Sequence, residues 1–161
     1  MSALPTDLAQ WLALRAHVEP ECLRPGERGV LVIEAEIPPG CHIEAHEPSE
    51  PFLVPAELNL EPVEGVATGP VRYPAAEEKR FVWSPAPLRV YRRSIRLETP
   101  VEIVTNTKAG SRMIRGKVQY QGCTPDACLM PAAQPVEVEL EVSSDKGCNS
   151  EKTRGKKGCK P

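Results

Sequence analysis

Proline is spread so evenly through this chain that long helices have little room to form. The 161 residues include 18 prolines, and few long stretches lack one. A proline inside a helix costs roughly 3 kcal/mol. Between the prolines lie short runs in which apolar and polar residues alternate, which is typical of half-buried strands. This distribution predicts an all-β protein of short strands joined by tight turns.

Seven to nine segments show the alternation. One clear run extends from Val30 to Ile37, with apolar residues on one face and Glu34 and Glu36 on the other. Further strands are expected at residues 14–18, 41–46 and 57–63, at 88–97 with a continuation over 101–104 after a bend at Pro100, and on both sides of residues 123–128. Residues 64–79, and the charged run 77–80, are expected to be loop. The pattern predicts an immunoglobulin-like antiparallel β-sandwich, with a closed β-barrel as the alternative.

The chain length fits one domain with short ends. Residues 1–13 are expected to be an N-terminal lead-in whose Trp11 can pack on the core, and residues 14–142 the sandwich domain. Residues 143–161 are expected to be a basic, disordered tail or linker, because they are rich in lysine and glycine. This tail has six basic and two acidic residues, a charge of about +4. The whole chain has a net charge of −2, so the rest of the chain carries about −6. An acidic body argues against nucleic acid as the main partner.

The first eleven residues show no basic region followed by a long apolar run. We therefore expect neither a signal peptide nor a transmembrane helix in this chain. The protein is then either cytosolic or a soluble piece of a longer exported protein, and the sequence leaves both open.

Cys123 and Cys128 are separated by four residues and lie between two alternating runs. A disulfide needs Cα atoms about 4.4–6.8 Å apart, and Thr124-Pro125-Asp126-Ala127 supplies a turn that brings the chain back. A bond that closes so short a loop gains little loop-closure entropy, whereas an exposed bond is open to attack by a partner's thiolate. The pair is a candidate for thiol–disulfide exchange, which needs no cofactor beyond the cysteines. A structural disulfide and two buried thiols are the alternatives.

Cys41, His42 and His46 are candidate ligands of a metal site. On a strand the two histidines would share a face, and with the cysteine they could bind copper or zinc. The interpretation we favour has no metal, with His42 beginning a strand and His46 exposed to solvent.

The remaining cysteines indicate no definite site. Cys22 and Cys41 are expected to be buried thiols or a pair. Cys148 and Cys159 lie in the basic tail, and their spacing from the Cys123 pair is not that of a zinc finger.

The segment Tyr120-Gln121-Gly122-Cys123, followed by Cys128 and Pro131, resembles the signature of the N-terminal periplasmic domain of the thiol:disulfide interchange protein DsbD family. Other segments resemble that family in the same order: Pro39–Ile43, Pro55–Leu58, Tyr73-Pro74, Leu88–Tyr91 and Pro100–Ile103. The resemblance spans roughly residues 14–142 and implies an immunoglobulin-like sandwich.

The resemblance also implies a function. In that family the domain receives reducing equivalents from a membrane-embedded domain through a thioredoxin-like domain. It passes them to periplasmic disulfide isomerases and cytochrome c maturation factors. This chain would then be a protein-disulfide reductase module in the periplasm or another extracytoplasmic space, tied to a membrane only through a larger parent protein. Cys123 and Cys128 would be the redox pair, and Cys128 would form the mixed disulfides.

Further residues are assigned around the pair. Tyr120, Pro125 and Asp126 are expected to contact partner proteins, and Phe81 and Trp83 are candidates for the family's shielding cap loop. The gap of four residues departs from the five of the best-known family member. The alternative function is a non-catalytic sandwich that binds a metal or a protein partner and uses the cysteines as a structural disulfide.

Overall fold

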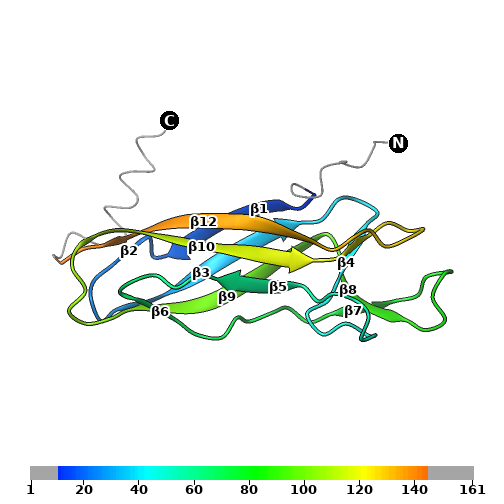
Figure 1. The fold of residues 1–161 in the computed structure, drawn as a ribbon, viewed down its shortest axis with the longest axis horizontal. Coiled ribbons are helices and arrows are strands. Elements are labelled where there is room, and N and C mark those ends of the chain that lie inside the picture. Colours follow the sequence, from blue (N-terminus) through cyan, green and yellow to red (C-terminus); the bar gives the residue numbers. More distant parts are fainter. Residues whose placement is uncertain (1–10, 145–161) are drawn as a thin grey trace.

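The computed structural model describes residues 11–144, which form twelve β-strands (Figure 1). In chain order these are β1 (Ala13–Glu19), β2 (Cys22–Leu23), β3 (Arg28–Glu36), β4 (His42–Glu44), β5 (Glu57–Leu60), β6 (Val66–Thr68), β7 (Glu77–Lys79), β8 (Leu88–Tyr91), β9 (Ser94–Ile103), β10 (Gly110–Tyr120), β11 (Gly122–Cys123) and β12 (Ala132–Val142). Within this range no helix is long and apolar enough to cross a membrane.

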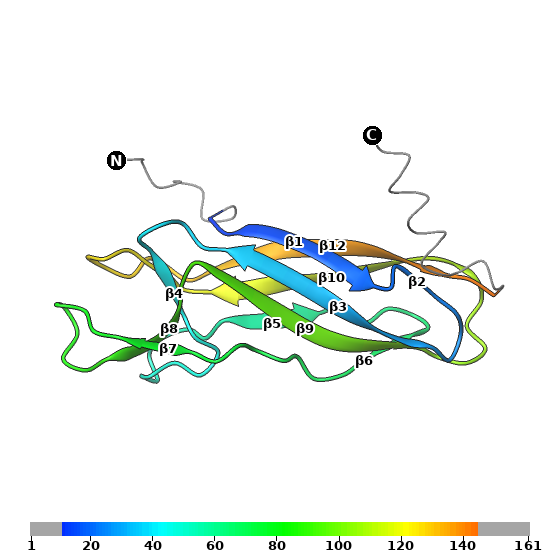
Figure 2. The ribbon, with the colours of Figure 1, turned by 180° about the vertical axis from the view of Figure 1, so that it is seen from behind.

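The strands form three four-stranded sheets, ordered β1-β3-β9-β6, β2-β12-β10-β5 and β11-β4-β8-β7. The first two sheets pack on each other, and the third lies at one end of the molecule (Figures 1 and 2). Their pairings are antiparallel except for β2 with β12. The predicted all-β, immunoglobulin-like sandwich is confirmed.

The alternation read from the sequence marks the core. In β9 the residues at every second position from Ile95 to Ile103 are buried, and in β10 those from Ile114 to Tyr120. Burying one such aliphatic side chain is worth about 1.5–3 kcal/mol. Because the two larger sheets share this core, they provide a rigid base for the small sheet at the end.

The bend expected at Pro100 lies elsewhere. Strand β9 runs without interruption through Pro100, whereas the chain turns between β8 and β9, where Arg93 has φ 69° and its carbonyl accepts a hydrogen bond from Ile37 N at 2.7 Å. Pro100 is tolerated because it lies beyond the end of β6 at Thr68, where its carbonyl accepts a hydrogen bond from Gly69 N at 2.9 Å and no ladder bond from its own nitrogen is required. This corner moves the chain from the small sheet to the first large sheet.

The loop expected over residues 64–79 contains two short strands, β6 and β7. Both are edge strands of three residues, and the first two residues of β7, Glu77 and Glu78, are exposed. Charged, short edges are common in natural sheets because they discourage further pairing. Three residues are too few for an alternation to be recognised in sequence.

Candidate redox site at the Cys123–Cys128 disulfide

The cysteine pair lies at the edge of the small sheet. Strand β11 pairs with β4, so that Cys123 is opposite His42 and Gly122 is opposite Ile43. Gly122 has no room for a side chain, because a Cβ would lie 2.5 Å from Cζ3 of Trp11. The indole of Trp11 therefore packs directly on the backbone before the first cysteine.

The turn after Cys123 closes on itself through Thr124. The Thr124 hydroxyl accepts hydrogen bonds from the backbone N–H groups of Asp126 and Ala127, both at 3.2 Å, and Thr124 N donates to Ala127 O at 2.8 Å. A short hydroxyl side chain commonly stabilises a turn in this way. The turn brings the two cysteines together across an antiparallel bridge.

Cys123 and Cys128 are joined in a disulfide with their Cα atoms 3.9 Å apart. Their environments differ, since Cys123 is 0% exposed whereas Cys128 is only half-buried. A protein partner can therefore approach the sulfur of Cys128 more readily than that of Cys123.

Two polar residues of β4 lie against the disulfide. His42 and Glu44 are 2% and 0% exposed. Glu44 Oε2 is 3.4 Å from Cys123 Sγ and 3.9 Å from Cys128 Sγ. A disulfide sulfur carries no proton, so these are contacts that become hydrogen bonds only when the pair is reduced.

The same two residues have unsatisfied polar atoms. His42 Nε2 lies 3.7 Å from Glu44 Oε2, and neither His42 Nε2 nor Glu44 Oε1 has a hydrogen-bond partner among residues 11–144. Sequence reasoning missed Glu44. The alternation puts it on one face with His42, but nothing local in the sequence indicates what covers that face.

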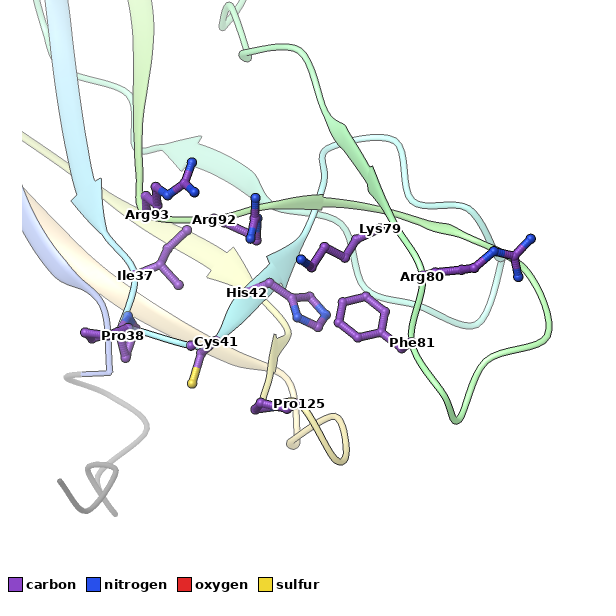
Figure 3. Close-up of a pocket in the computed structure, with 12 residues that line it drawn as sticks. Ile37, Pro38, Cys41, His42, Lys79, Arg80, Phe81, Arg92, Arg93 and Pro125 are labelled. Atoms are coloured by element: carbon purple, nitrogen blue, oxygen red, sulfur yellow. The ribbon is translucent and has the colours of Figure 1, made fainter. Parts of the chain in front are cut away.

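The loop between β7 and β8, residues 80–87, covers the site, and we call it the aromatic loop. Phe81 stacks on His42 with ring centroids 4.5 Å apart, as the two rings in Figure 3 show. Trp83 stacks on Phe81 at 5.2 Å and donates a hydrogen bond from Nε1 to Pro125 O at 2.9 Å. The loop is thus joined both to β4 and to the cysteine turn, while its Val82 is fully exposed.

A cavity of about 500 Å³ opens beside His42 and Phe81 (Figure 3). Its lining includes four basic residues: Lys79, Arg80, Arg92 and Arg93. Arg92 is paired with Glu77, with Nη2 and Oε1 2.9 Å apart. The lining of this cavity is therefore basic, although the domain as a whole is acidic.

Cys41 also lines this cavity and is a free, buried thiol. Burial raises the pKa of this thiol. Cys22 is disulfide-bonded, so the pairing of Cys22 with Cys41 considered above does not occur. Cys148 and Cys159, and the proposed tail from residue 145 on, lie outside the described residues.

Two of the sequence assignments need correction. Tyr120 was expected to contact partners, but it is 1% exposed, and its hydroxyl donates to Gln134 Oε1 at 2.8 Å. It packs against Trp11 and supports the hairpin from within, whereas Pro125 and Asp126 are exposed on the turn.

His46 was expected to be solvated, but it is partly buried. Its ring stacks on Tyr73 with centroids 3.6 Å apart, and its Nδ1 lies 2.9 Å from Ala56 O. It therefore points away from His42, and the metal site considered at Cys41, His42 and His46 is not assembled.

Comparisons with known proteins agree with this geometry. A family model described as thiol:disulfide interchange protein DsbD, N-terminal, matches residues 9–140. The fold is similar to the N-terminal periplasmic domain of ScsB from Proteus mirabilis, at 13% identity and TM-score 0.55, covering 87% of this chain and 49% of that one. This chain thus spans about half the length of that structure.

A second solved structure is the DsbD N-terminal domain of Neisseria meningitidis in its reduced form, at 16% identity and TM-score 0.44, covering 81% of this chain and 85% of that one. A comparison with curated proteins finds no match. Because the family model covers most of the chain, the chain belongs to the DsbD N-terminal family.

Proposed function

We propose that this domain passes reducing equivalents through Cys123 and Cys128 from a thioredoxin-like donor to extracytoplasmic protein disulfides. The unequal exposure of the two sulfurs supports this proposal best. Cys128 is the half-buried sulfur of the pair, and Cys123 is fully enclosed next to Glu44. The more exposed sulfur can form a mixed disulfide with a partner protein, and the buried sulfur next to it can then resolve that bond.

The reaction requires only thiols and disulfides. A thiolate of the donor attacks Cys128 Sγ, and the Cys123 thiolate leaves. The second donor thiol resolves the mixed disulfide, so two electrons have reached the pair and the donor holds the new disulfide. The Cys128 thiolate then attacks the acceptor's disulfide, and Cys123 attacks Cys128 Sγ, which releases the acceptor as a dithiol and restores the Cys123–Cys128 bond.

The aromatic loop is proposed to shield the pair between these steps. Phe81 and Trp83 bridge from β4 to the turn through ring stacking and one hydrogen bond to Pro125 O. Each of those contacts is weak enough for a docking partner to displace. Pro125 and Asp126, exposed on the same turn, are proposed to contact that partner.

Membership of the family supports the following proposals for location and partners. We place the domain in the periplasm or another extracytoplasmic space, as one part of a larger enzyme that contains a membrane domain. Disulfide isomerases and cytochrome c maturation factors are the proposed acceptors, and a thioredoxin-like domain or protein is the proposed donor.

The test is to trap the mixed disulfide. Cys123→Ser leaves Cys128 without its resolving partner. Mixed with the oxidised form of a thioredoxin-like protein, the Cys128 thiolate of this variant should attack that protein's disulfide and accumulate as a mixed disulfide, mapped by mass spectrometry to Cys128. Cys128→Ser should accumulate much less. If a thioredoxin-like dithiol fails to reduce the Cys123–Cys128 bond of the folded wild-type protein, the proposal is refuted.

A further inference from the structure

We propose that reduction of Cys123 and Cys128 creates a Zn²⁺ site, in which the two thiolates, His42 Nε2 and Glu44 form a tetrahedral set of ligands. The disulfide form cannot bind the ion in this way, because its sulfurs are bonded to each other. The inference rests on the proposed function only in requiring that the pair can be reduced.

Donor spacing is the first argument. One ligand atom from each of the four residues lies within 4.8 Å of all the others. Zinc bonds of about 2.0–2.3 Å imply donor–donor distances of roughly 3.3–3.8 Å in a tetrahedron. Glu44 Oε2 lies 3.4 Å from Cys123 Sγ, 3.9 Å from Cys128 Sγ and 3.7 Å from His42 Nε2. The two bonded sulfurs must separate, which reduction allows, and Cys128 lies beside the exposed residues of the turn.

The second argument is independent of spacing. Buried polar atoms almost always have a hydrogen-bond partner, yet His42 Nε2 and Glu44 Oε1 have none among the described residues. Both residues are more than nine-tenths buried, and both adjoin the sulfur pair. A cation bound by these two residues would give their polar side chains the partner that no hydrogen bond supplies.

The chemistry of the donors selects the ion. Thiolates and an imidazole favour zinc over the hard cations magnesium and calcium, and four protein ligands form a closed site. Two thiolates and one carboxylate around Zn²⁺ leave a net charge of −1. The basic residues of the adjacent cavity, Lys79 and Arg92 among them, would offset that charge.

The redox step is balanced by an external dithiol. It gives two electrons and two protons to the disulfide and becomes a disulfide itself. Zinc then displaces the two thiol protons, and both leave to solvent. Zinc-held thiolates are withdrawn from exchange while the ion is bound. When an acceptor disulfide takes two electrons from the pair and becomes a dithiol, the Cys123–Cys128 bond re-forms and the ion is released, so the site would link zinc binding to the redox state of the domain.

The experiment uses the full chain and Zn²⁺ alone. Oxidised protein and protein reduced with a phosphine, both freed of metal, are dialysed against limiting Zn²⁺, and bound zinc and free thiols are counted separately. Reduced wild type should hold one more zinc than reduced Cys123→Ser/Cys128→Ser. The other cysteines contribute equally to both proteins, so the difference reports this site.

Matched variants identify the ligands. His42→Gln and Glu44→Gln should each weaken binding at this site by more than about 100-fold, because loss of even an outer-shell partner typically costs 10–100-fold. His46→Gln and Cys41→Ser, which change neighbouring donors outside the set, should bind as wild type does. Substitution with Co²⁺ should give the visible absorption of a tetrahedral thiolate complex in wild type and not in the double-serine variant.

The outcomes separate the two proposals. If free-thiol counts show that the pair is reduced but no additional zinc is bound, the zinc site is refuted and the exchange function stands. If the pair in the folded protein cannot be reduced by a dithiol, the exchange function itself fails. Equal loss of zinc in His42→Gln and His46→Gln would refute the assigned ligands.

Discussion

At the scale of single residues, exposure distinguishes the three cysteines near the site. Cys123 and Cys41 are 0% and 5% exposed, whereas Cys128 is half-buried. Cys41 is a free thiol whose pKa is raised by burial, and it lines the cavity next to His42. Because the thiolate is the reactive form, these environments predict different rates of modification.

We expect Cys41 in the folded protein to be alkylated slowly at about pH 8, where an ordinary cysteine with a pKa near 8.5 already reacts. A raised pKa keeps Cys41 protonated at that pH, so its reaction should accelerate only as pH rises further. Because Cys41 deprotonates at lower pH in the unfolded chain than in the folded protein, its contribution to the free energy of unfolding is present at low pH and is lost as pH rises through the pKa of the folded protein. Iodoacetamide labelling with peptide mapping measures the rate.

Urea-unfolded protein is the control, and in it Cys41 should react as an ordinary cysteine does. Equal rates for folded and unfolded protein at about pH 8 would show that burial does not protect this thiol.

At the scale of elements, three segments that are distant in the chain assemble the site. Strand β4 supplies His42 and Glu44, the turn after β11 supplies the cysteines, and the aromatic loop between β7 and β8 covers both. The loop is held by Phe81, which stacks on His42 and packs against a small apolar cluster, and by one hydrogen bond from Trp83 to the cysteine turn.

Trp83→Ala should accelerate reduction of the Cys123–Cys128 bond by a small dithiol. The variant loses a hydrogen bond worth about 0.5–1.5 kcal/mol and an aromatic pair worth about 0.5–1.5 kcal/mol. At tenfold per 1.4 kcal/mol, reduction through an open loop should be roughly 5- to 100-fold faster. Stopped-flow measurement of reduction by dithiothreitol checks this.

Val82→Ala is the matched control, since Val82 lies in the same loop and is fully exposed. Its rate should equal that of wild type. If Trp83→Ala and Val82→Ala were reduced at the same rate, the loop would have no shielding role.

At the scale of the whole molecule, the small sheet that carries the site lies at one end of the sandwich, and its Ile43 and Tyr91 join the main core. The two larger sheets are held by long ladders such as β10 with β12 and β3 with β9, and the core includes residues such as Leu97 and Leu140. The disulfide joins residues only five apart within one turn, so it ties no sheets together.

Cys123→Ala/Cys128→Ala should therefore fold and lose exchange completely. The loop-closure model predicts that opening a bridge over so short a loop lowers the free energy of unfolding by only about 2 kcal/mol. Leu140→Ala, a fully buried core residue, should lower it by about 2–5 kcal/mol while leaving the cysteines in place. Urea denaturation and an insulin-type reduction assay test both variants.

A different result would favour the alternative function. If the double-alanine variant failed to fold while the wild-type pair showed no exchange, the disulfide would be structural.

Local patterns were sufficient for the strands of the core and for the cysteine turn. The alternation in β3, β9, β10 and β12 is long enough to be read directly, and turn residues between Cys123 and Cys128 indicated that the chain reverses there. The corner at Arg93 was not predictable, because the break there depends on where the small sheet meets the large one, and Pro100 gave a stronger but misleading signal. Strands β6 and β7 are defined only by their pairing with β9 and β8, which no local pattern in so short a segment indicates.

The sequence by itself determined the fold class, the turn that lets Cys123 and Cys128 approach each other, and the resemblance to the family, because each is encoded in local patterns along the chain. Only the tertiary structure decided that Cys128 is the more exposed cysteine of the pair, that Tyr120 is buried, and that Phe81 lies on His42. It also placed Glu44 against both sulfurs. The physical reason is that burial and contact at this site are set by three segments far apart in sequence, and no period or spacing within one segment encodes what covers it.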